Sequence, residues 1–235
     1  MTHPGEQHRN GISQKLNWLR AGVLGANDGI VSTAGVVIGV AAAAPGNVQA
    51  IATAGVAALV AGALSMAGGE YVSVSTQRDT ERALIEKEKR ELAEQPAEEL
   101  LELAGFYRDR GLSAGLAQRV AEELTAHDAL AAHAEVELGI DHQEFTSPWL
   151  AAGSSFVSFA VGAAIPLGMI LLPVGDHRVW AAALAVVLGL FLTGWISAGL
   201  GDAPRGRAIL RNVAMGTLTM AATYLIGTLF GVAIA

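Results

Sequence analysis

Five long apolar runs dominate the sequence, and each is long enough to cross a lipid bilayer. A transmembrane α-helix needs roughly 20 apolar residues to span about 30 Å of hydrocarbon. The runs cover residues 21–44, 48–76, 149–174, 179–200 and 213–235. Polar segments separate them, and all but the one between the second and third runs are short; the last, residues 201–211, holds a proline and three arginines. We therefore expect an all-α polytopic membrane protein with five transmembrane helices.

The segment between the second and third runs is rich in charged residues, unlike the apolar runs on either side. Residues 78–148 hold 17 acidic and 8 basic residues, whereas the whole chain has a net charge of −7. Pro96 and Gly111 divide this segment into three expected helices, at 78–95, 97–110 and 113–139. Its negative charge excludes nucleic acid as a partner and favours cations. We expect residues 78–148 to form a cytoplasmic, metal-binding helical insert between membrane segments 1–77 and 149–235.

The distribution of lysine and arginine predicts the orientation of the spans. With the N-terminus in the cytoplasm, the N-terminal tail, the insert and the 201–211 segment all face inward. These segments carry 14 of the 15 basic residues, and only Arg178 faces outward. Cytoplasmic loops are typically enriched in Lys and Arg. We therefore expect a cytoplasmic N-terminus and a C-terminus on the outside.

Polar residues inside the first two spans are the main candidates for a metal site within the membrane. Asn27 and Asp28 lie in the first span, and Met66 and Glu70 lie in the second. Both carboxylates are expected at a depth of about 12 Å from the cytoplasmic boundary, at 1.5 Å per residue. Two carboxylates and a thioether favour a transition metal such as Fe²⁺ or Mn²⁺. In the alternative interpretation, Asp28 caps or kinks a helix, Met66 fills the core and Glu70 reaches interfacial water.

A second set of candidate ligands lies in the acidic insert. Glutamates three residues apart share a helical face, where an anchoring cation would relieve their repulsion. His133 and Glu137, four residues apart, offer a further pair. The spacing therefore predicts metal ligands at Glu88, Glu91, Glu99, Glu102, His133 and Glu137. The alternative is a solvated acidic surface that is balanced by neighbouring Lys and Arg.

Catalysis is not expected from this sequence. The chain has no cysteine, which excludes thiolate nucleophiles and thiolate metal sites. No phosphate loop or dinucleotide fingerprint is present, so no organic cofactor is predicted. Glycine pairs four residues apart, at 25/29, 35/39 and 227/231, allow close helix packing, either within one bundle or between two copies of the chain.

Several motifs resemble the vacuolar iron transporter family. They are W-L-R at 18–20, G-A-N-D-G at 25–29, A-G-A-L-S-M at 61–66 and G-E-Y-V-S at 69–73. The resemblance covers nearly the whole chain and looks like that of a bacterial member. It implies a homodimer with its pathway between the two first spans, which exports Fe²⁺ or Mn²⁺ from the cytosol in exchange for protons. The membrane would then be the bacterial inner membrane.

The resemblance also implies roles for individual residues. Asp28 and Met66 match pathway residues of the family, and its metal-binding glutamates match Glu88, Glu91, Glu99, Glu102 and Glu137. Two positions depart from the family pattern. Ala58 stands where some members carry a pathway acid, so we expect either that Glu70 takes over that role or that the site is weaker. His133 and Ala134 stand where some members carry paired methionines, so His133 is expected to replace one soft ligand.

The sequence therefore predicts a divalent-metal transporter that works by proton antiport, with Asp28 and Glu70 alternating between metal-bound and protonated states. Zn²⁺ and Co²⁺ remain open as further cargo. Two alternatives also remain: a passive divalent-cation channel, and a membrane-anchored metal sensor or buffer that transports nothing.

Overall fold

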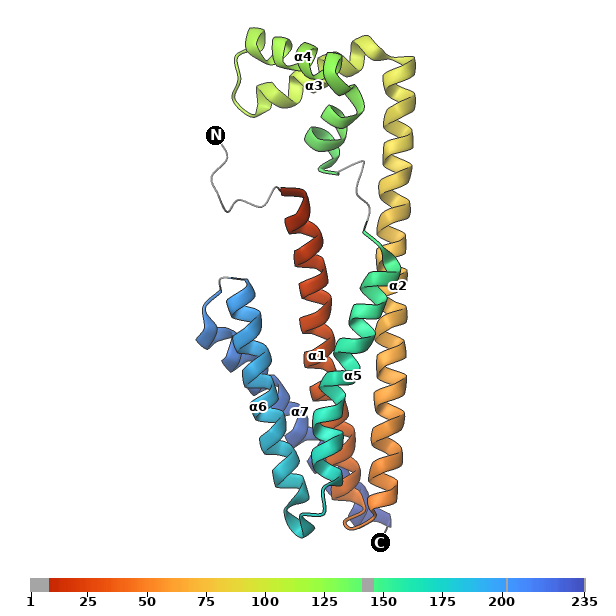
Figure 1. The fold of residues 1–235 in the computed structure, drawn as a ribbon, viewed down its shortest axis with the longest axis vertical. Helices are drawn as coiled ribbons and strands as arrows, with labels where there is room; N and C mark the ends of the chain where they lie inside the picture. The colour runs from red at the N-terminus through yellow and green to blue at the C-terminus, as the bar shows by residue number, and fades with distance from the viewer. Residues whose placement is uncertain (1–8, 141–145, 202, 235) are drawn as a thin grey trace. The chain divides into compact units, whose positions relative to one another are not determined.

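The structure is a computed structural model that describes residues 9–140, 146–201 and 203–234 (Figure 1). Five of its helices are long and apolar enough to cross a membrane. Shorter helices lie between the second and the third of these five. The expected all-α fold with five spans and a helical insert is therefore confirmed. The elements are α1 (Arg9–Ala43), α2 (Val48–Glu94), α3 (Pro96–Asp109), α4 (Ala114–His133), η1 (Ala134–Leu138), α5 (Pro148–Leu171), η2 (Gly175–His177), α6 (Arg178–Leu200) and α7 (Arg205–Ile234).

The described residues separate into two compact units. The membrane unit contains Lys15–Tyr71 and the helices from Pro148 onward. The insert unit contains the residues from Val72 to Ser147. Helix α2 contributes residues to both, because it continues without a break from its apolar half into its charged half. Each unit is described by itself below.

Turn chemistry explains where the long helices begin. Gly46 has a φ of 87°, a left-handed conformation that favours glycine, and it ends the turn after α1. The side-chain Oδ1 of Asn47 then accepts a hydrogen bond from the backbone N–H of Ala50 at 3.0 Å, which caps the start of α2. Pro96 occupies the first turn of α3, where its missing N–H costs nothing.

All five long helices contribute side chains to the core of the membrane unit. Residues of α1 lie at its centre, including Ile30, Val37 and Ile38, and they are almost fully buried. Around them pack buried side chains of the other four helices, namely Ile51, Leu167, Ile170, Ala182, Val186, Leu190 and Met220. In a bilayer such packing is stabilised mainly by van der Waals contact between helices.

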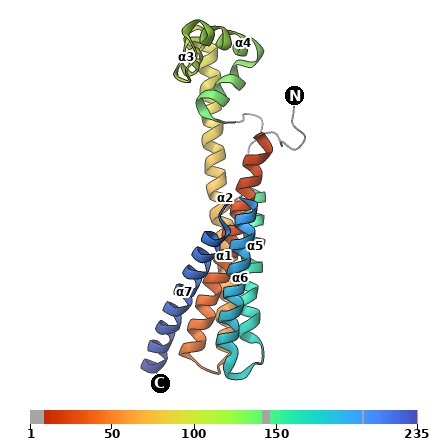
Figure 2. The ribbon, with the colours of Figure 1, turned by 90° about the vertical axis from the view of Figure 1, so that its left-hand side faces the viewer.

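Small residues let α1 approach its neighbours closely. A side-chain carbon added at Gly162 of α5 would overlap the carbonyl oxygen of Ala26. One added at Gly29 would overlap the carbonyl oxygen of Phe159, and one added at Gly227 of α7 would overlap that of Gly39. The predicted glycine motifs therefore pack within a single chain. Helix α7 also packs on α6 (Figure 2).

Two expected helix boundaries were wrong. The last span begins at Arg205 instead of residue 213, because the backbone turns into helix directly after Pro204 and the arginines join its first two turns. The third insert helix, expected to be continuous over 113–139, breaks at Asp128, whose φ of −160° and ψ of 96° are extended. The π-helical turn η1 then replaces its last part.

The insert unit has a small core of its own between α3 and α4. Leu103 and Ala104 of α3 pack against Ala121 and Ala132 of α4 and are almost completely buried. Tyr107, Leu124 and Val136 lie at the edge of this cluster. The core fixes α3 and α4 against each other and so places the polar residues at the adjoining helix ends.

Candidate metal centre

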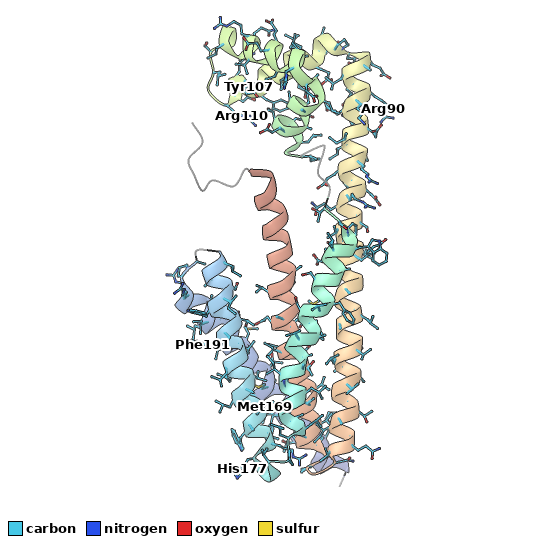
Figure 3. All side chains as sticks on the ribbon, viewed as in Figure 1. Arg90, Tyr107, Arg110, Met169, His177 and Phe191 are labelled. Carbon is cyan, nitrogen blue, oxygen red and sulfur yellow. The ribbon has the colours of Figure 1, made fainter. Side chains whose placement is uncertain are left out.

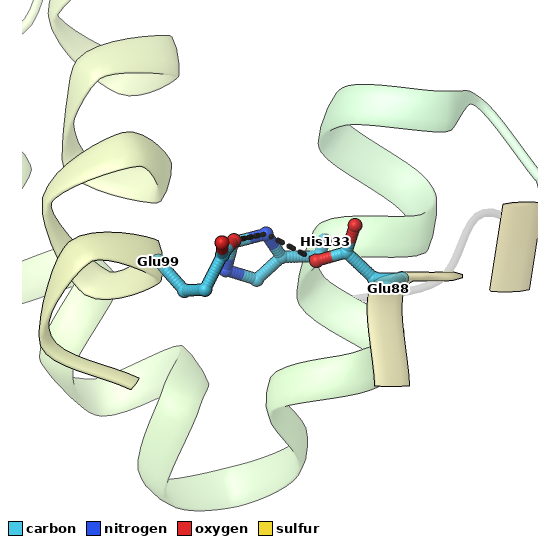
Figure 4. A group of neighbouring side chains, drawn as sticks. All are labelled: Glu88, Glu99 and His133. Carbon is cyan, nitrogen blue, oxygen red and sulfur yellow. Dashed lines mark ion pairs between the residues drawn. The ribbon is translucent and has the colours of Figure 1, made fainter. Parts of the chain in front are cut away.

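Three side chains from three different helices meet inside the insert unit (Figure 4). Glu88 comes from the charged half of α2, Glu99 from the first turn of α3 and His133 from the last residue of α4. Each offers one ligand atom, and these atoms all lie within 4.8 Å of one another. His133 is 0% exposed, Glu88 2% and Glu99 7%, so this cluster is shielded from water.

The distances within the cluster match those between ligands of one ion. Nδ1 of His133 lies 3.0 Å from Oε1 of Glu88 and 3.7 Å from Oε2 of Glu99. Oε2 of Glu137 is a third carboxylate oxygen near the same nitrogen, at 3.5 Å. Ligands about 2.1 Å from a metal lie roughly 3.0 Å apart in octahedral and roughly 3.4 Å apart in tetrahedral geometry. The spacing of these ligand atoms therefore suits a single cation.

Two atoms of the cluster are buried without a hydrogen bond from any of the described residues. They are Oε1 of Glu88 and Nε2 of His133. Oε1 of Glu88 forms an ion pair with Nδ1 of His133 when the imidazole is protonated, but it accepts no hydrogen bond there. Burying an unpaired polar atom costs free energy, so native proteins rarely leave one without a partner. A bound cation would satisfy the carboxylate oxygen directly.

The electrostatics of the cluster also favour a cation. Burial raises the pKa of Glu88 above the ordinary glutamate value, and the nearby carboxylate of Glu137 raises it further. Burial likewise raises the pKa of Glu99, followed by repulsion from Glu102. His133 lowers the pKa of both glutamates, but by less than burial raises it. Negative charge is therefore costly here without a compensating positive charge.

The ligand types indicate which cations the cluster suits. Carboxylate oxygens alone are typical of sites for Mg²⁺ or Ca²⁺. A buried imidazole shifts the preference toward transition metals such as Fe²⁺ and Zn²⁺. The combination of Glu88, Glu99 and His133 is therefore better suited to a divalent transition metal than to an alkaline-earth ion.

The other predicted insert ligands have different surroundings. Oε2 of Glu91 accepts a hydrogen bond from Nζ of Lys87 at 2.6 Å, which makes an exposed ion pair. Glu102 lies close enough to Glu99 to raise its pKa. This pair has the usual spacing of four residues on one helix, and it agrees with the alternative expectation of an acidic surface balanced by neighbouring Lys and Arg. Roles of Glu91 and Glu102 in metal binding stay predictions.

The predicted pathway residues lie in the membrane unit. Asp28 is half-buried in α1, and its backbone carbonyl accepts a hydrogen bond from Oγ of Ser32 at 2.6 Å. Oδ1 of Asn27 is buried, and no residue in the described part of the chain donates a hydrogen bond to it. Met66 packs against the apolar cluster around Phe159, and Glu70 is half-buried in α2. That these residues line a pathway stays a prediction.

The sequence did not reveal how the end of α4 is held. Nη2 of Arg110 donates a hydrogen bond to the backbone carbonyl of Val136 at 3.1 Å, which links the end of α3 to η1. Only the position of Arg110 beside a helix-ending Gly111 signals that its guanidinium sits at a helix terminus. No spacing rule predicts its partner across the loop.

Comparison with known proteins identifies the family to which the chain belongs. The sequence profile described as the VIT family matches residues 19–228. A vacuolar iron transporter of Acanthamoeba castellanii is 41% identical over 226 residues, which cover 96% of this chain and 83% of that protein. Vacuolar iron transporter homolog 1 of Oryza sativa is 39% identical, with coverage of 97% and 80%. Homolog 3 of Arabidopsis thaliana is 35% identical, with coverage of 90% and 82%. The chain therefore belongs to the VIT family, a family of membrane transporters.

Proposed function

We propose that this protein exports Fe²⁺, and also Mn²⁺, from the cytosol in exchange for protons. The observation that carries the proposal is the buried group of Glu88, Glu99 and His133, whose ligand atoms lie within 4.8 Å of one another. Iron is the cargo named for the similar Acanthamoeba protein. The five apolar helices supply the membrane part that a transporter needs.

Proton exchange supplies the driving force in this proposal. Moving a divalent cation outward against an inside-negative potential of about 100 mV costs about 4.6 kcal/mol. Two protons moving inward balance that charge. Asp28 and Glu70 would bind metal and protons in alternation. The buried and unpaired Oδ1 of Asn27 supports a cation site next to Asp28.

The insert would act before the membrane step. Residues 78–148 form a cytoplasmic metal-binding domain in this proposal, and it collects metal for the pathway. Glu91, Glu102 and Glu137 assist the buried group, and Met66 adds a soft ligand within the membrane. The N-terminus lies in the cytoplasm and the C-terminus outside, as the Lys and Arg distribution indicates. We further propose a homodimer in the bacterial inner membrane, with its pathway between the two α1 helices.

Transport into proteoliposomes tests this proposal. The purified chain is reconstituted, Fe²⁺ or Mn²⁺ is added outside, and metal entry and internal pH are followed together with and without an imposed pH gradient. Metal entry that is coupled to proton exit supports antiport. Metal entry that ignores the gradient would indicate a passive channel. Metal binding without any entry would indicate a membrane-anchored sensor or buffer.

A further inference from the structure

The segment that carries His133 and Glu137 is not a simple continuation of α4. At Asp128 the backbone leaves the helical conformation, with a φ of −160° and a ψ of 96°. Oδ1 of Asp128 then accepts a hydrogen bond from the backbone N–H of Ala131 at 2.9 Å, as an N-cap residue does. The direction of this segment is therefore set after Asp128, independently of the longer part of α4.

The far end of this segment closes as a π-helical turn. The turn η1 closes through the carbonyl of Ala134, which accepts hydrogen bonds from the N–H groups of Gly139 and Ile140. Gly139 has a left-handed φ of 66° and ends the helix. Val136 lies within the last turn, where carbonyls lack an intrahelical donor. Among the described residues, the side chain that donates to its carbonyl lies outside this segment.

Arg110 supplies that donor from the end of α3. Its Nη2 lies 3.1 Å from the carbonyl oxygen of Val136. The guanidinium also lies over the ring of Tyr107, 5.7 Å from the ring centroid, and both residues belong to the insert (Figure 3). Tyr107 in turn packs against the core between α3 and α4. The Tyr107 ring thus fixes the Arg110 guanidinium in place, and the guanidinium in turn holds η1 through the Val136 carbonyl.

This link joins the elements that carry the metal-ligand candidates. Helix α3 carries Glu99, and the segment held by Arg110 carries His133 and Glu137 on either side of Val136. Without a cation, the carboxylates repel one another and favour separation of these elements. A hydrogen bond to a backbone carbonyl is insensitive to that repulsion, so it keeps the ligands together in the metal-free state.

We propose that Arg110 is a positioning residue of the metal centre, which it serves by holding the His133–Glu137 segment against α3. This inference rests on the proposed role of the insert in metal binding. Partners that orient metal ligands typically change metal affinity about 10- to 100-fold when they are mutated. A ligand set held in place before the metal arrives binds more tightly, because less ordering is required on binding.

Titration of the full-length protein in detergent with Co²⁺ tests this role, because Co²⁺ reports its ligand geometry through its visible absorption. Arg110→Met keeps the aliphatic stem but removes every donor. We expect about tenfold weaker Co²⁺ binding and an altered absorption spectrum. Arg110→Lys, which keeps a charged donor, should restore part of the affinity. Arg119→Met removes an exposed arginine of α4 and should match the wild type.

The outcomes separate this inference from the proposed function. If Arg110→Met lowers thermal stability but leaves the Co²⁺ affinity and spectrum unchanged, Arg110 is only a structural cap and the inference is overturned. If the wild type binds no Co²⁺, the metal centre itself fails, and this inference fails with it. Should Arg110→Met not fold, Arg110→Gln gives the same comparison with a polar side chain too short to replace the arginine.

Discussion

Nδ1 of His133 lies 3.0 Å from Oε1 of Glu88, yet the two atoms do not form a hydrogen bond. The residues come from different helices, and both side chains are almost fully buried. Such a contact leaves a buried carboxylate oxygen without a donor, so it is unfavourable while the imidazole is neutral. It is favourable once both atoms share a cation. This relationship therefore makes His133 the most informative residue to change.

The first prediction concerns loss of the imidazole. His133→Ala removes a ligand that Glu88 and Glu99 cannot replace, since both already face the same point. We expect the affinity of the full-length protein for Co²⁺ or Fe²⁺ to fall by at least about tenfold, since even outer-shell changes have that effect. Isothermal titration of the detergent-purified protein measures it.

Two further variants control this experiment. His127→Ala removes an exposed histidine from the same helix and should leave the affinity unchanged. His133→Met keeps a ligand but makes it soft, so binding should survive with a changed ranking of Co²⁺, Zn²⁺ and Mn²⁺. Equal metal affinity in the wild type and in His133→Ala would exclude His133 as a ligand.

The second prediction concerns the effect of pH on the metal-free insert. The pKa values of Glu88 and Glu99 are raised in the folded state above the ordinary value of 4.5, mainly by burial. The folded state then binds protons more tightly than the unfolded state. Its stability is highest below the ordinary pKa and is lost as pH rises through the raised pKa. Neighbouring groups contribute to these shifts, namely Glu91, Glu102, Glu137 and His133.

Hydrogen exchange of the full-length, metal-free protein measures this dependence. Protection of amides in α3 and α4, corrected for the intrinsic effect of pH on exchange, should fall as pH rises from 4.5 toward neutrality. Glu88→Gln should weaken the dependence, because glutamine stays neutral throughout. Addition of Co²⁺ at neutral pH should restore protection. Protection that rises with pH would contradict the raised pKa values.

The sequence predicted the membrane part well because its signals are long. An apolar run long enough to span a bilayer is a strong signal for a transmembrane helix, and all five runs form helices. The start of the last span was missed, because Arg205, Arg207 and Arg211 are charged but still continue the helix. Hydropathy marks only the apolar part of a helix, whereas this helix begins earlier, directly after Pro204.

The candidate metal centre was predicted in part. The sequence indicated Glu88, Glu99 and His133 individually, and helical spacing paired His133 with Glu137. Spacing along a helix cannot show which residues of different helices meet, because this depends on the loops between them. The break at Asp128 was also missed, since a single aspartate inside a helical pattern carries no strong stop signal. This break decides where His133 points.

The third prediction concerns the membrane pathway. Asp28→Asn removes the charge but keeps the size of the side chain, so the protein should fold and insert normally. We expect proton-coupled Fe²⁺ uptake into proteoliposomes to fall to background, because a neutral amide cannot exchange metal for a proton. Asp109→Asn alters an exposed aspartate of the insert and should leave uptake intact. Unchanged transport by Asp28→Asn would remove Asp28 from the mechanism.

The fourth prediction concerns the close contact between α1 and α5. A side-chain carbon at Gly162 would overlap the backbone carbonyl of Ala26, which cannot move without shifting α1. We expect Gly162→Ala to destabilise the membrane unit by about 1–3 kcal/mol, the usual cost of overpacking. Gly168→Ala, on the same helix but with open space at the added carbon, should be neutral or stabilising. Thermal unfolding of both variants in detergent measures the difference in stability. Because Ala26 lies two residues before Asp28, Gly162→Ala should also slow metal transport. Co²⁺ binding by the insert should stay unchanged in this variant.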